Sequence, residues 1–457
     1  GEARLIQMGA SSSRRGGKPS KSDAAAPDDA DGDNADGLGV PDGAESSSLS
    51  KGYEDLVNAI VRPPRMKYEE RALGPQTFSF SRKRFMRQDL ELKNSRGHKL
   101  VCSWWKFDPQ DAPAAPLPCI IYLHGNASCR LGAQELLWHL LPAAITVFAL
   151  DFSGSGLSGG DYVSLGFYER EDVAAVIQHL RSSGEVSTIG LWGHSMGAVT
   201  ALLYGDRDPS IAGMVIDSAF ADLMQLINEL GRGLREQGLR VPGFAISVAV
   251  NMIRRSVRRR AKFDPKEVNP VANGGQSFIP ALFAHAERDN FIKPSHSQQL
   301  HAAYAGDKNL ILFDGDHNSV RPDFLYDSAV IFLRQTLGVK DEHCLSRADG
   351  LNFDRDVFRG ASAAVRQSED EMMRQAMMLS VMAAGQGSVR VDVAPQALRD
   401  GVHAFSDVTG MGGETAHYYV ETSLSQGEPV ESAIQRYFDC GCVQPPAGWR
   451  PQVALPA

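Results

Sequence analysis

One stretch decides the fold, an apolar run that leads straight into a serine set between two glycines: Val186-Ser187-Thr188-Ile189-Gly190-Leu191-Trp192-Gly193-His194-Ser195-Met196-Gly197. The run before Gly193 predicts a buried β-strand, and residues 198–204 predict a helix directly after the turn. Glycines on either side let the strand and the helix approach closely, so that the turn lifts Ser195 clear of the backbone. The stretch therefore predicts an α/β domain with Ser195 at the end of a central strand.

A second buried strand lies upstream and ends at a candidate anion-binding turn. Residues 119–123 are apolar and lead into His124-Gly125-Asn126. Enzymes that carry a serine in a turn of this kind place a second oxyanion donor at this position. The backbone N–H of Asn126 or Ala127, together with that of Met196 at the start of the next helix, would then stabilise an oxyanion.

Two downstream strands supply a carboxylate and an imidazole. The strand 279–286 leads to Asp289, and the strand 309–313 leads to the loop that carries His317. The order Ser195, Asp289, His317 predicts that His317 removes the serine proton while Asp289 fixes the imidazole tautomer and stabilises the imidazolium.

Three other titratable residues compete for these roles. Asp217 ends the apolar strand 213–216 and is a rival acid, because a few proteins with this arrangement place the carboxylate there. His124 and His285 close or lie within apolar strands, where a histidine is more often a structural group than a base. We favour Asp289 and His317.

Residues from about 51 to 340 resemble an α/β-hydrolase domain of the serine hydrolase superfamily. Residues 151–158 resemble the D-x-x-G-x-G-x-S segment that many lipases, esterases and serine aminopeptidases of this fold share. The resemblance is nearest to cytosolic hydrolases with an H-G-N oxyanion segment. It implies a mostly parallel eight-stranded sheet and an ester, thioester or amide substrate, either a small molecule or an acylated protein. The chemistry needs neither a metal nor an organic cofactor.

Residues 221–270 lie where this fold commonly carries a lid. The run 244–253 predicts an apolar helix that leads into a basic cluster: Arg254, Arg255, Arg258, Arg259, Arg260 and Lys262. Two interpretations stay open. The helix covers an acyl pocket and touches an anionic membrane, or it is an ordinary outer helix with a solvated basic end.

The composition excludes several classes of protein. The 457 residues are 43% hydrophobic, which is enough for one large core and a smaller unit. A net charge of −8 argues against a nucleic-acid binder. The six cysteines lack C-x-x-C spacing, and no stretch approaches the ~20 apolar residues of a membrane span. We therefore expect reduced thiols and a cytoplasmic protein.

The first fifty residues predict a disordered tail, because they contain no aromatic side chain. Residues 8–13 match the N-myristoylation pattern M-G-x-x-x-[ST]. If Met8 is the true start, Gly9 would carry the acyl chain, and four nearby basic residues would strengthen peripheral membrane attachment: Arg14, Arg15, Lys18 and Lys21. The alternative is a chance match within a low-complexity segment.

Residues 341–365 predict a linker, and residues 366–386 after it predict a helix. An acidic block at 369–371 precedes four residues at i, i+3, i+4 and i+7 on one helix face: Met373, Ala376, Met377 and Ser380. The pattern resembles a ubiquitin-interacting motif, in which the alanine lets the helix sit close to ubiquitin. The trailing acid of that motif is absent, because uncharged residues follow at 381–384. The alternative is a Met-rich helix docked onto its own domain.

Residues 396–440 predict three short helices ahead of a tail at 441–457. This segment resembles the ubiquitin-associated-like domain that opens certain adaptor proteins of the AAA ATPase unfoldase system. The two resemblances together imply ubiquitin or ubiquitinated proteins as partners. A competing hypothesis is a ubiquitin-pathway adaptor whose hydrolase domain is a catalytically idle scaffold with Ser195 as a turn residue.

Overall fold

The computed structural model describes residues 57–80, 82–236, 243–345, 363–371, 395–409 and 413–425, with single positions at 54, 374, 411, 433 and 437. The predicted disordered tail with Gly9, the tail at 441–457 and the four predicted ubiquitin contacts lie outside the described residues; those contacts are Met373, Ala376, Met377 and Ser380.

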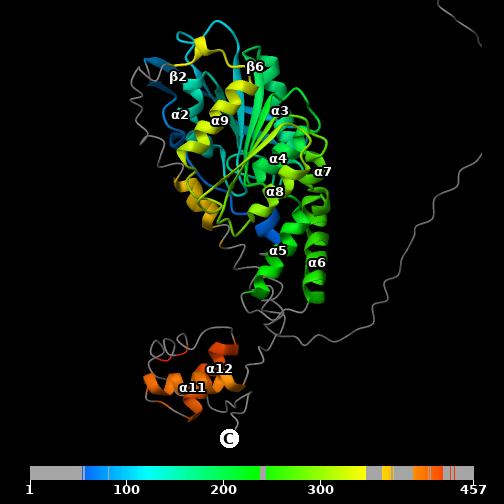
Figure 1. Cartoon of the computed structure of the whole chain (residues 1–457), viewed down its shortest axis with the longest axis vertical. Coiled ribbons are helices and arrows are strands. Elements are labelled where there is room, and N and C mark those ends of the chain that lie inside the picture. Colours follow the sequence, from blue (N-terminus) through cyan, green and yellow to red (C-terminus); the bar gives the residue numbers. More distant parts are fainter. Residues whose placement is uncertain are drawn as a thin grey trace, which may run out of the picture. The chain divides into compact units, whose positions relative to one another are not determined.

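A nine-stranded mixed sheet runs through the α/β domain (Figure 1). Its order is β1-β2-β3-β5-β4-β6-β7-β8-β9. The first four strands in this order pair antiparallel, and every pairing from β5 to β9 is parallel. The strands are β1 Thr77–Phe80, β2 Lys83–Lys93, β3 Lys99–Phe107, β4 Leu117–Leu123, β5 Thr146–Leu150, β6 Val186–His194, β7 Gly213–Asp217, β8 Ala281–Ala286 and β9 Lys308–Phe313.

The prediction of eight mostly parallel strands is therefore wrong in the number of strands and in the extent of the antiparallel part. The edge strand β1 has only four residues, which is too short to show the alternation that identifies a strand. The strand β2 pairs antiparallel with β1 on one side and forms a long antiparallel pair with β3 on the other. The α/β-hydrolase architecture itself is present.

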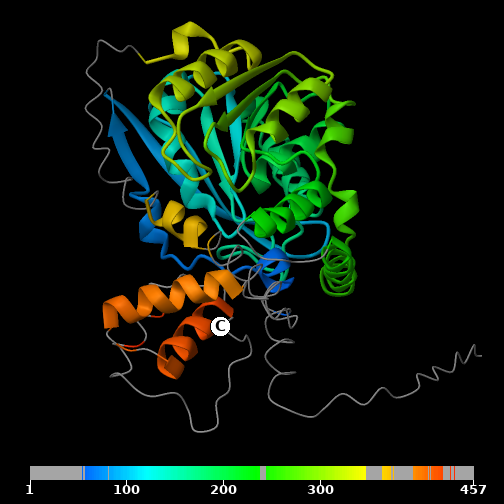
Figure 2. The ribbon, with the colours of Figure 1, turned by 60° about the horizontal axis from the view of Figure 1, so that its bottom comes forward.

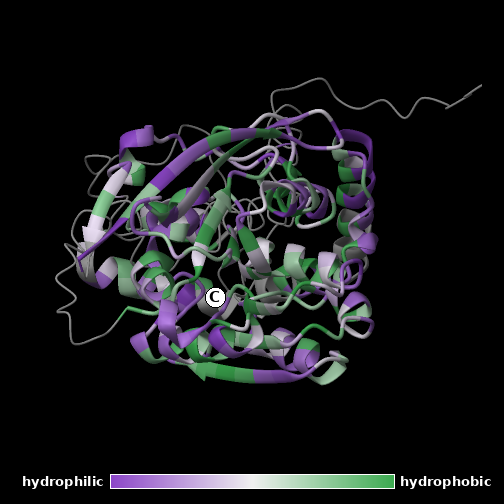
Figure 3. Cartoon of the chain, turned by 90° about the horizontal axis from the view of Figure 1, so that it is seen from above, coloured by the Kyte–Doolittle hydropathy of each residue, from purple (hydrophilic) through white to green (hydrophobic). Residues whose placement is uncertain are grey.

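Helices cover both faces of the sheet (Figures 1 and 2). On one face the buried side chains of α2 and α9 complete one hydrophobic cluster, and on the other face those of α3, α4 and α8 complete a second. Figure 3 shows hydrophobic residues along the central strands and mixed residues along the surrounding helices. The helices of this domain are α2 Gln134–Leu140, α3 Glu169–Ser183, α4 Met196–Gly205, α5 Leu223–Glu236, α6 Gly243–Ala261, α7 Pro270–Gly274, α8 Pro294–Ala303 and α9 Asp323–Thr336.

The predicted insert at 221–270 holds α5 and α6, which lie side by side beyond the sheet (Figure 1). In the half of α6 whose side chains are described, Ile253, Val257 and Ala261 join the main core. The opposite face is exposed and carries Met252 with a group of arginines. This half of α6 is an outer helix with a basic solvent face. None of the helices within the described ranges is both long and apolar enough to cross a bilayer.

Two further helices, α11 Pro395–Thr409 and α12 Gly413–Ser425, pack around an aromatic centre of their own. The rings of Phe405 and Tyr419 stack at 5.9 Å, and Tyr437 meets both rings edge-on at 5.4 and 5.3 Å. Ala433 and Tyr437, described single positions of the predicted third helix, are buried in this cluster. A small helical unit therefore exists within the predicted segment 396–440.

The junction of β6 and α4 leaves no space beside its glycines. A Cβ at Gly197 would overlap the carbonyl oxygen of Leu123, and one at Gly193 would overlap the backbone at Gly197. The side chains of every residue of α4 are buried, so the helix cannot move outward without exposing core. Only glycine fits at these two positions.

We predict that Gly197→Ala lowers the free energy of unfolding by about 3 kcal/mol or more, because backbone must move to admit one methyl group. Gly275→Ala is the control, since this glycine has φ −65° and its nearest neighbouring atom would lie 3.6 Å from the new Cβ. Urea unfolding should show the control unchanged or about 0.5–1 kcal/mol more stable. Equal stability of both variants would contradict the tight junction.

Candidate active site

Ser195 occupies a strained turn between β6 and α4. Its φ is 51° and its ψ −115°, a conformation that costs a non-glycine residue about 1–3 kcal/mol. The backbone N–H of Ser195 donates to the carbonyl oxygen of Asp217 on the neighbouring strand at 2.8 Å. That bond and the glycines on either side hold the turn, and the side chain remains 8% exposed.

The structure brings Ser195, His317 and Asp289 together, although they lie on three separate segments. Oγ of Ser195 is 3.0 Å from Nε2 of His317, and Nδ1 of His317 is 2.6 Å from Oδ2 of Asp289. Because a carboxylate only accepts, the proton of a neutral His317 lies on Nδ1. Nε2 is then free to accept the hydroxyl proton of Ser195.

Asp289 is held by several donors at the end of β8. Its Oδ1 accepts the backbone N–H groups of Phe291 and Ile292 at 3.0 and 2.8 Å. Burial alone would raise the pKa of Asp289, but the charge of His317 and the hydrogen bonds from His285 and His317 hold this pKa well below its usual range. The acid is therefore ionised wherever the protein is folded at neutral pH.

The three predicted oxyanion donors lie at the two expected turns. Met196 begins α4, so its N–H belongs to the unpaired first turn of a helix. The N–H of Ala127 donates to the side chain of Asn126 at 3.1 Å. Within the described part of the chain, the N–H of Asn126 donates to no protein acceptor. Geometry therefore favours Asn126 over Ala127 as the second donor.

Asp151 is hydrogen-bonded to the segment that follows the predicted oxyanion turn. Its carboxylate accepts the backbone N–H groups of Arg130 and Leu157, each at 2.8 Å, and the hydroxyl of Tyr68 at 2.7 Å. The D-x-x-G-x-G-x-S segment is thus a brace that joins the loop after β5 to the loop after β4.

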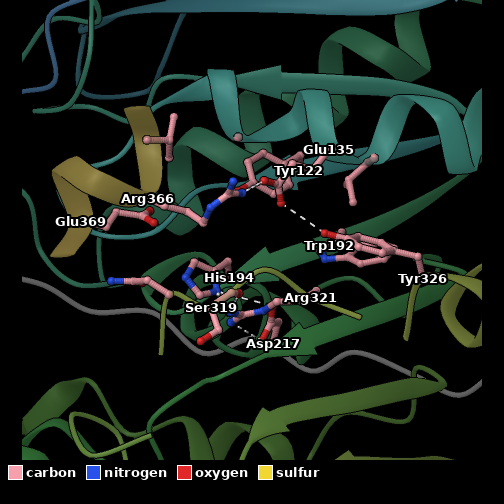
Figure 4. A pocket seen from close by; sticks show the side chains of 14 residues that line it. Tyr122, Glu135, Trp192, His194, Asp217, Ser319, Arg321, Tyr326, Arg366 and Glu369 are labelled. Carbon is pink, nitrogen blue, oxygen red and sulfur yellow. Dashed lines mark hydrogen bonds and ion pairs between the residues drawn. The ribbon is translucent and has the colours of Figure 1, made fainter. Parts of the chain in front are cut away.

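Asp217, the rival acid, is occupied by a residue that the sequence analysis missed. Arg321 donates to both carboxylate oxygens of Asp217, at 2.8 and 2.9 Å, and to the carbonyl oxygen of Ser319 at 2.6 Å (Figure 4). Burial would raise the pKa of Asp217, but the charge of Arg321 together with His194 lowers it far more. The Asp217 carboxylate faces Arg321 and His194 and makes no described contact with His317.

Arg321 ties the loop of His317 to the strand beside Ser195. It follows His317 by four residues, while its partner Asp217 lies 104 residues away in the chain. Both side chains are 8% exposed. No pattern in the sequence joins such distant positions, so the ion pair appears only with the fold.

The other two candidate histidines are structural groups in the fold. Nε2 of His124 accepts the N–H of Phe152 at 3.0 Å, and burial lowers the pKa of His124. His285 lies between the hydroxyl of Ser297 at 2.6 Å and the carbonyl oxygen of Ile292 at 2.7 Å. In the described ranges no group of three His, Cys, Asp or Glu side chains could hold a metal ion.

The strand order and the edge of the sheet at which these side chains meet define an α/β-hydrolase fold. Residues 114–266 match the model of the serine aminopeptidase family S33. The chain is 30% identical over 213 residues to the uncharacterized protein YqkD of Bacillus subtilis, which covers 46% of this chain and 66% of YqkD. It is 27% identical over 141 residues to lysophosphatidylserine lipase ABHD12 of Rattus norvegicus, which covers 28% of this chain and 35% of ABHD12.

Among solved structures, the chain is similar to the esterase Pf2001 of Pyrococcus furiosus. Its TM-score is 0.46 at 22% identity, with 61% of this chain and 99% of the esterase covered. The chain therefore matches 66% of the length of YqkD and 35% of that of ABHD12.

We predict that Arg321→Met lowers the free energy of unfolding by about 3–5 kcal/mol, because it leaves the buried Asp217 carboxylate without its partner. Adding Asp217→Leu should restore most of that loss. Arg288→Met, which removes an ion pair to Asp314 at 69% and 73% exposure, is the control and should cost less than about 1 kcal/mol. If urea unfolding showed equal losses of stability for Arg321→Met and the control, the proposed coupling between Arg321 and Asp217 would be refuted.

Proposed function

We propose that the chain is a serine hydrolase in which Ser195 is the nucleophile, His317 the general base and Asp289 the residue that orients His317. The observation that carries the proposal is the continuous chain of contacts from the Ser195 hydroxyl to Nε2 of His317 and from Nδ1 of His317 to Asp289. The competing hypothesis, an idle scaffold, has no need of this alignment.

In the proposed reaction Oγ of Ser195 attacks the substrate carbonyl while Nε2 of His317 takes the hydroxyl proton. The carbonyl oxygen becomes an oxyanion that accepts from the N–H groups of Met196 and Asn126. When the tetrahedral intermediate collapses, His317 gives its proton to the leaving oxygen, sulfur or nitrogen. Water then attacks the acyl–serine ester with the same base, which releases the acid and restores the Ser195 hydroxyl.

An acyl ester or thioester on a lipid or protein is the substrate class that we favour. The relative ABHD12 is named a lysophosphatidylserine lipase, which is an ester hydrolase acting on a lipid. This relative supports lipid acyl esters as the first compounds to assay.

We predict that Ser195→Ala and His317→Ala each reduce fluorophosphonate labelling by at least about a thousandfold, because the probe reacts only with an activated serine. Ser187→Ala is the matched control, since Ser187 lies at the exposed start of the same strand. Loss of labelling in the control, or labelling that survives Ser195→Ala, would refute the assignment.

We also propose that the C-terminal region binds ubiquitin through the helix predicted at 366–386 and the helical unit at 396–440. The support is the sequence resemblance together with the aromatic centre shared by α11 and α12. Acylation of Gly9 stays a prediction. So does peripheral contact of the protein with an anionic membrane, to which the exposed basic face of α6 would contribute.

The full chain should be retained on ubiquitin resin, and Ala376→Arg should remove most of that retention because a large charged side chain prevents close approach of the helix. The Gly275→Ala variant is the control and should be retained like the unaltered chain. Unchanged retention of Ala376→Arg would assign binding to the segment 396–440 alone. Equal retention of the unaltered chain on blank resin would contradict ubiquitin binding altogether.

A further inference from the structure

The helical segment 363–371 packs against the catalytic domain at three points. Arg366 pairs with Glu135 on α2, and Asp370 accepts from the side-chain amide of Asn318 at 2.8 Å. Val365 is buried in the hydrophobic cluster on one face of the sheet. Figure 4 shows Arg366 and Glu369 of this segment lining the same pocket as His194 and Ser319. The segment therefore rests on the domain through an ion pair, a hydrogen bond and an apolar contact.

These contacts place the segment across the two loops that carry the catalytic groups. Asn318 directly follows His317, and Gly125 directly precedes Asn126. A Cβ built on Gly125 would lie 2.9 Å from Oε1 of Glu369 and 3.7 Å from Cβ of Ser195. The Glu369 carboxylate is thus less than about 7 Å from the Ser195 side chain.

Glu369 is an unusual group to find at this place. It is 7% exposed, and its Oε1 is buried without a hydrogen-bond donor among the described residues. Arg366 and Arg321 interact with the charge of Glu369, but they donate their side-chain hydrogen bonds to Glu135 and Asp217 respectively. A buried carboxylate oxygen without a donor is costly, so the position calls for a functional reason.

The space next to Glu369 is small while the segment is in place. Val365, Arg366 and Glu369 form one wall of a cavity of about 60 Å³, and Tyr122, His194 and Asn318 contribute to the others. Such a volume holds a few water molecules, whereas ligand pockets measure about 300–1,000 Å³. The space beside Glu369 is therefore too small for a ligand while the segment is in place.

We propose that segment 363–371 is an intramolecular cover that keeps the hydrolase in a state of low activity, with Glu369 as the inhibiting group. The inference rests on the proposed serine hydrolase function. Negative charge develops on the substrate carbonyl oxygen in the transition state, at the N–H groups of Met196 and Asn126. A carboxylate beside the turn of Asn126 repels that charge and raises the barrier. Release of the cover removes the repulsion and opens the cavity.

The test uses the full chain with Glu369→Gln, which keeps the shape of the side chain and removes its charge. The rate constant of fluorophosphonate labelling and kcat/KM for p-nitrophenyl acetate should both rise about tenfold. Glu371→Gln is the matched control, because it makes the same change two residues along on an exposed side chain; it should change neither value more than about twofold. Arg366→Ala, which removes the ion pair to Glu135, is a second variant and should also raise both rates.

Thermal unfolding midpoints will show that each variant is folded. The proposal of an inhibitory cover would be overturned if the rates of Glu369→Gln were at or below those of the unaltered chain. It would also be overturned if the rates of Glu371→Gln rose equally. In those cases, labelling of the unaltered chain would still support the proposed serine hydrolase function. Absence of labelling in the chain and all variants would overturn both proposals.

Discussion

The turn at Ser195 is the constraint on which the rest of the site depends. A serine at positive φ is stable here because its N–H donates to the carbonyl oxygen of Asp217 and because Gly193 and Gly197 allow β6 and α4 to touch. The turn fixes three things at once: the direction of the Ser195 hydroxyl, the first N–H of α4, and the distance to His317. A looser turn would lose all three.

The loop of His317 is fixed by a second constraint, the buried pair of Arg321 and Asp217. Since the same Asp217 accepts the backbone N–H of Ser195, one residue links the turn of Ser195 to the loop of His317. The carboxylate that faces the imidazole of His317 is Asp289. Buried ion pairs of this kind add little net stability, but removing one partner strongly lowers the free energy of unfolding.

Much of the site could be predicted from the sequence, because strands, glycines and polar residues at strand ends follow local rules. The turn at Ser195, the carboxylate after β8 and the imidazole after β9 are such features. The pair of Arg321 and Asp217 and the contacts of Glu369 depend on tertiary neighbours, so no local pattern shows them. The short edge strand β1 was missed for lack of alternation. Residues 366–371 of the predicted helix contact the domain, whereas the methionines of that helix lie outside the described residues.

The acidic block at 369–371 would have two proposed uses, the cover and ubiquitin binding, that exclude each other. In the structure Glu369 is buried and Asp370 is bound to Asn318. The same acids belong to the predicted ubiquitin-interacting helix, so a partner that binds them must first lift the segment from the domain. Binding of such a partner and opening of the active site would then be one event.

The most direct measurement of the central claim is the proton NMR signal of the Nδ1–H group between His317 and Asp289. A hydrogen bond of 2.6 Å to a buried carboxylate should give a resonance far downfield of the amide region. The signal should be present in the unaltered chain and absent from both Asp289→Asn and His317→Gln. A spectrum with no such resonance, or one in which it survives these substitutions, would contradict the arrangement that links Ser195, His317 and Asp289.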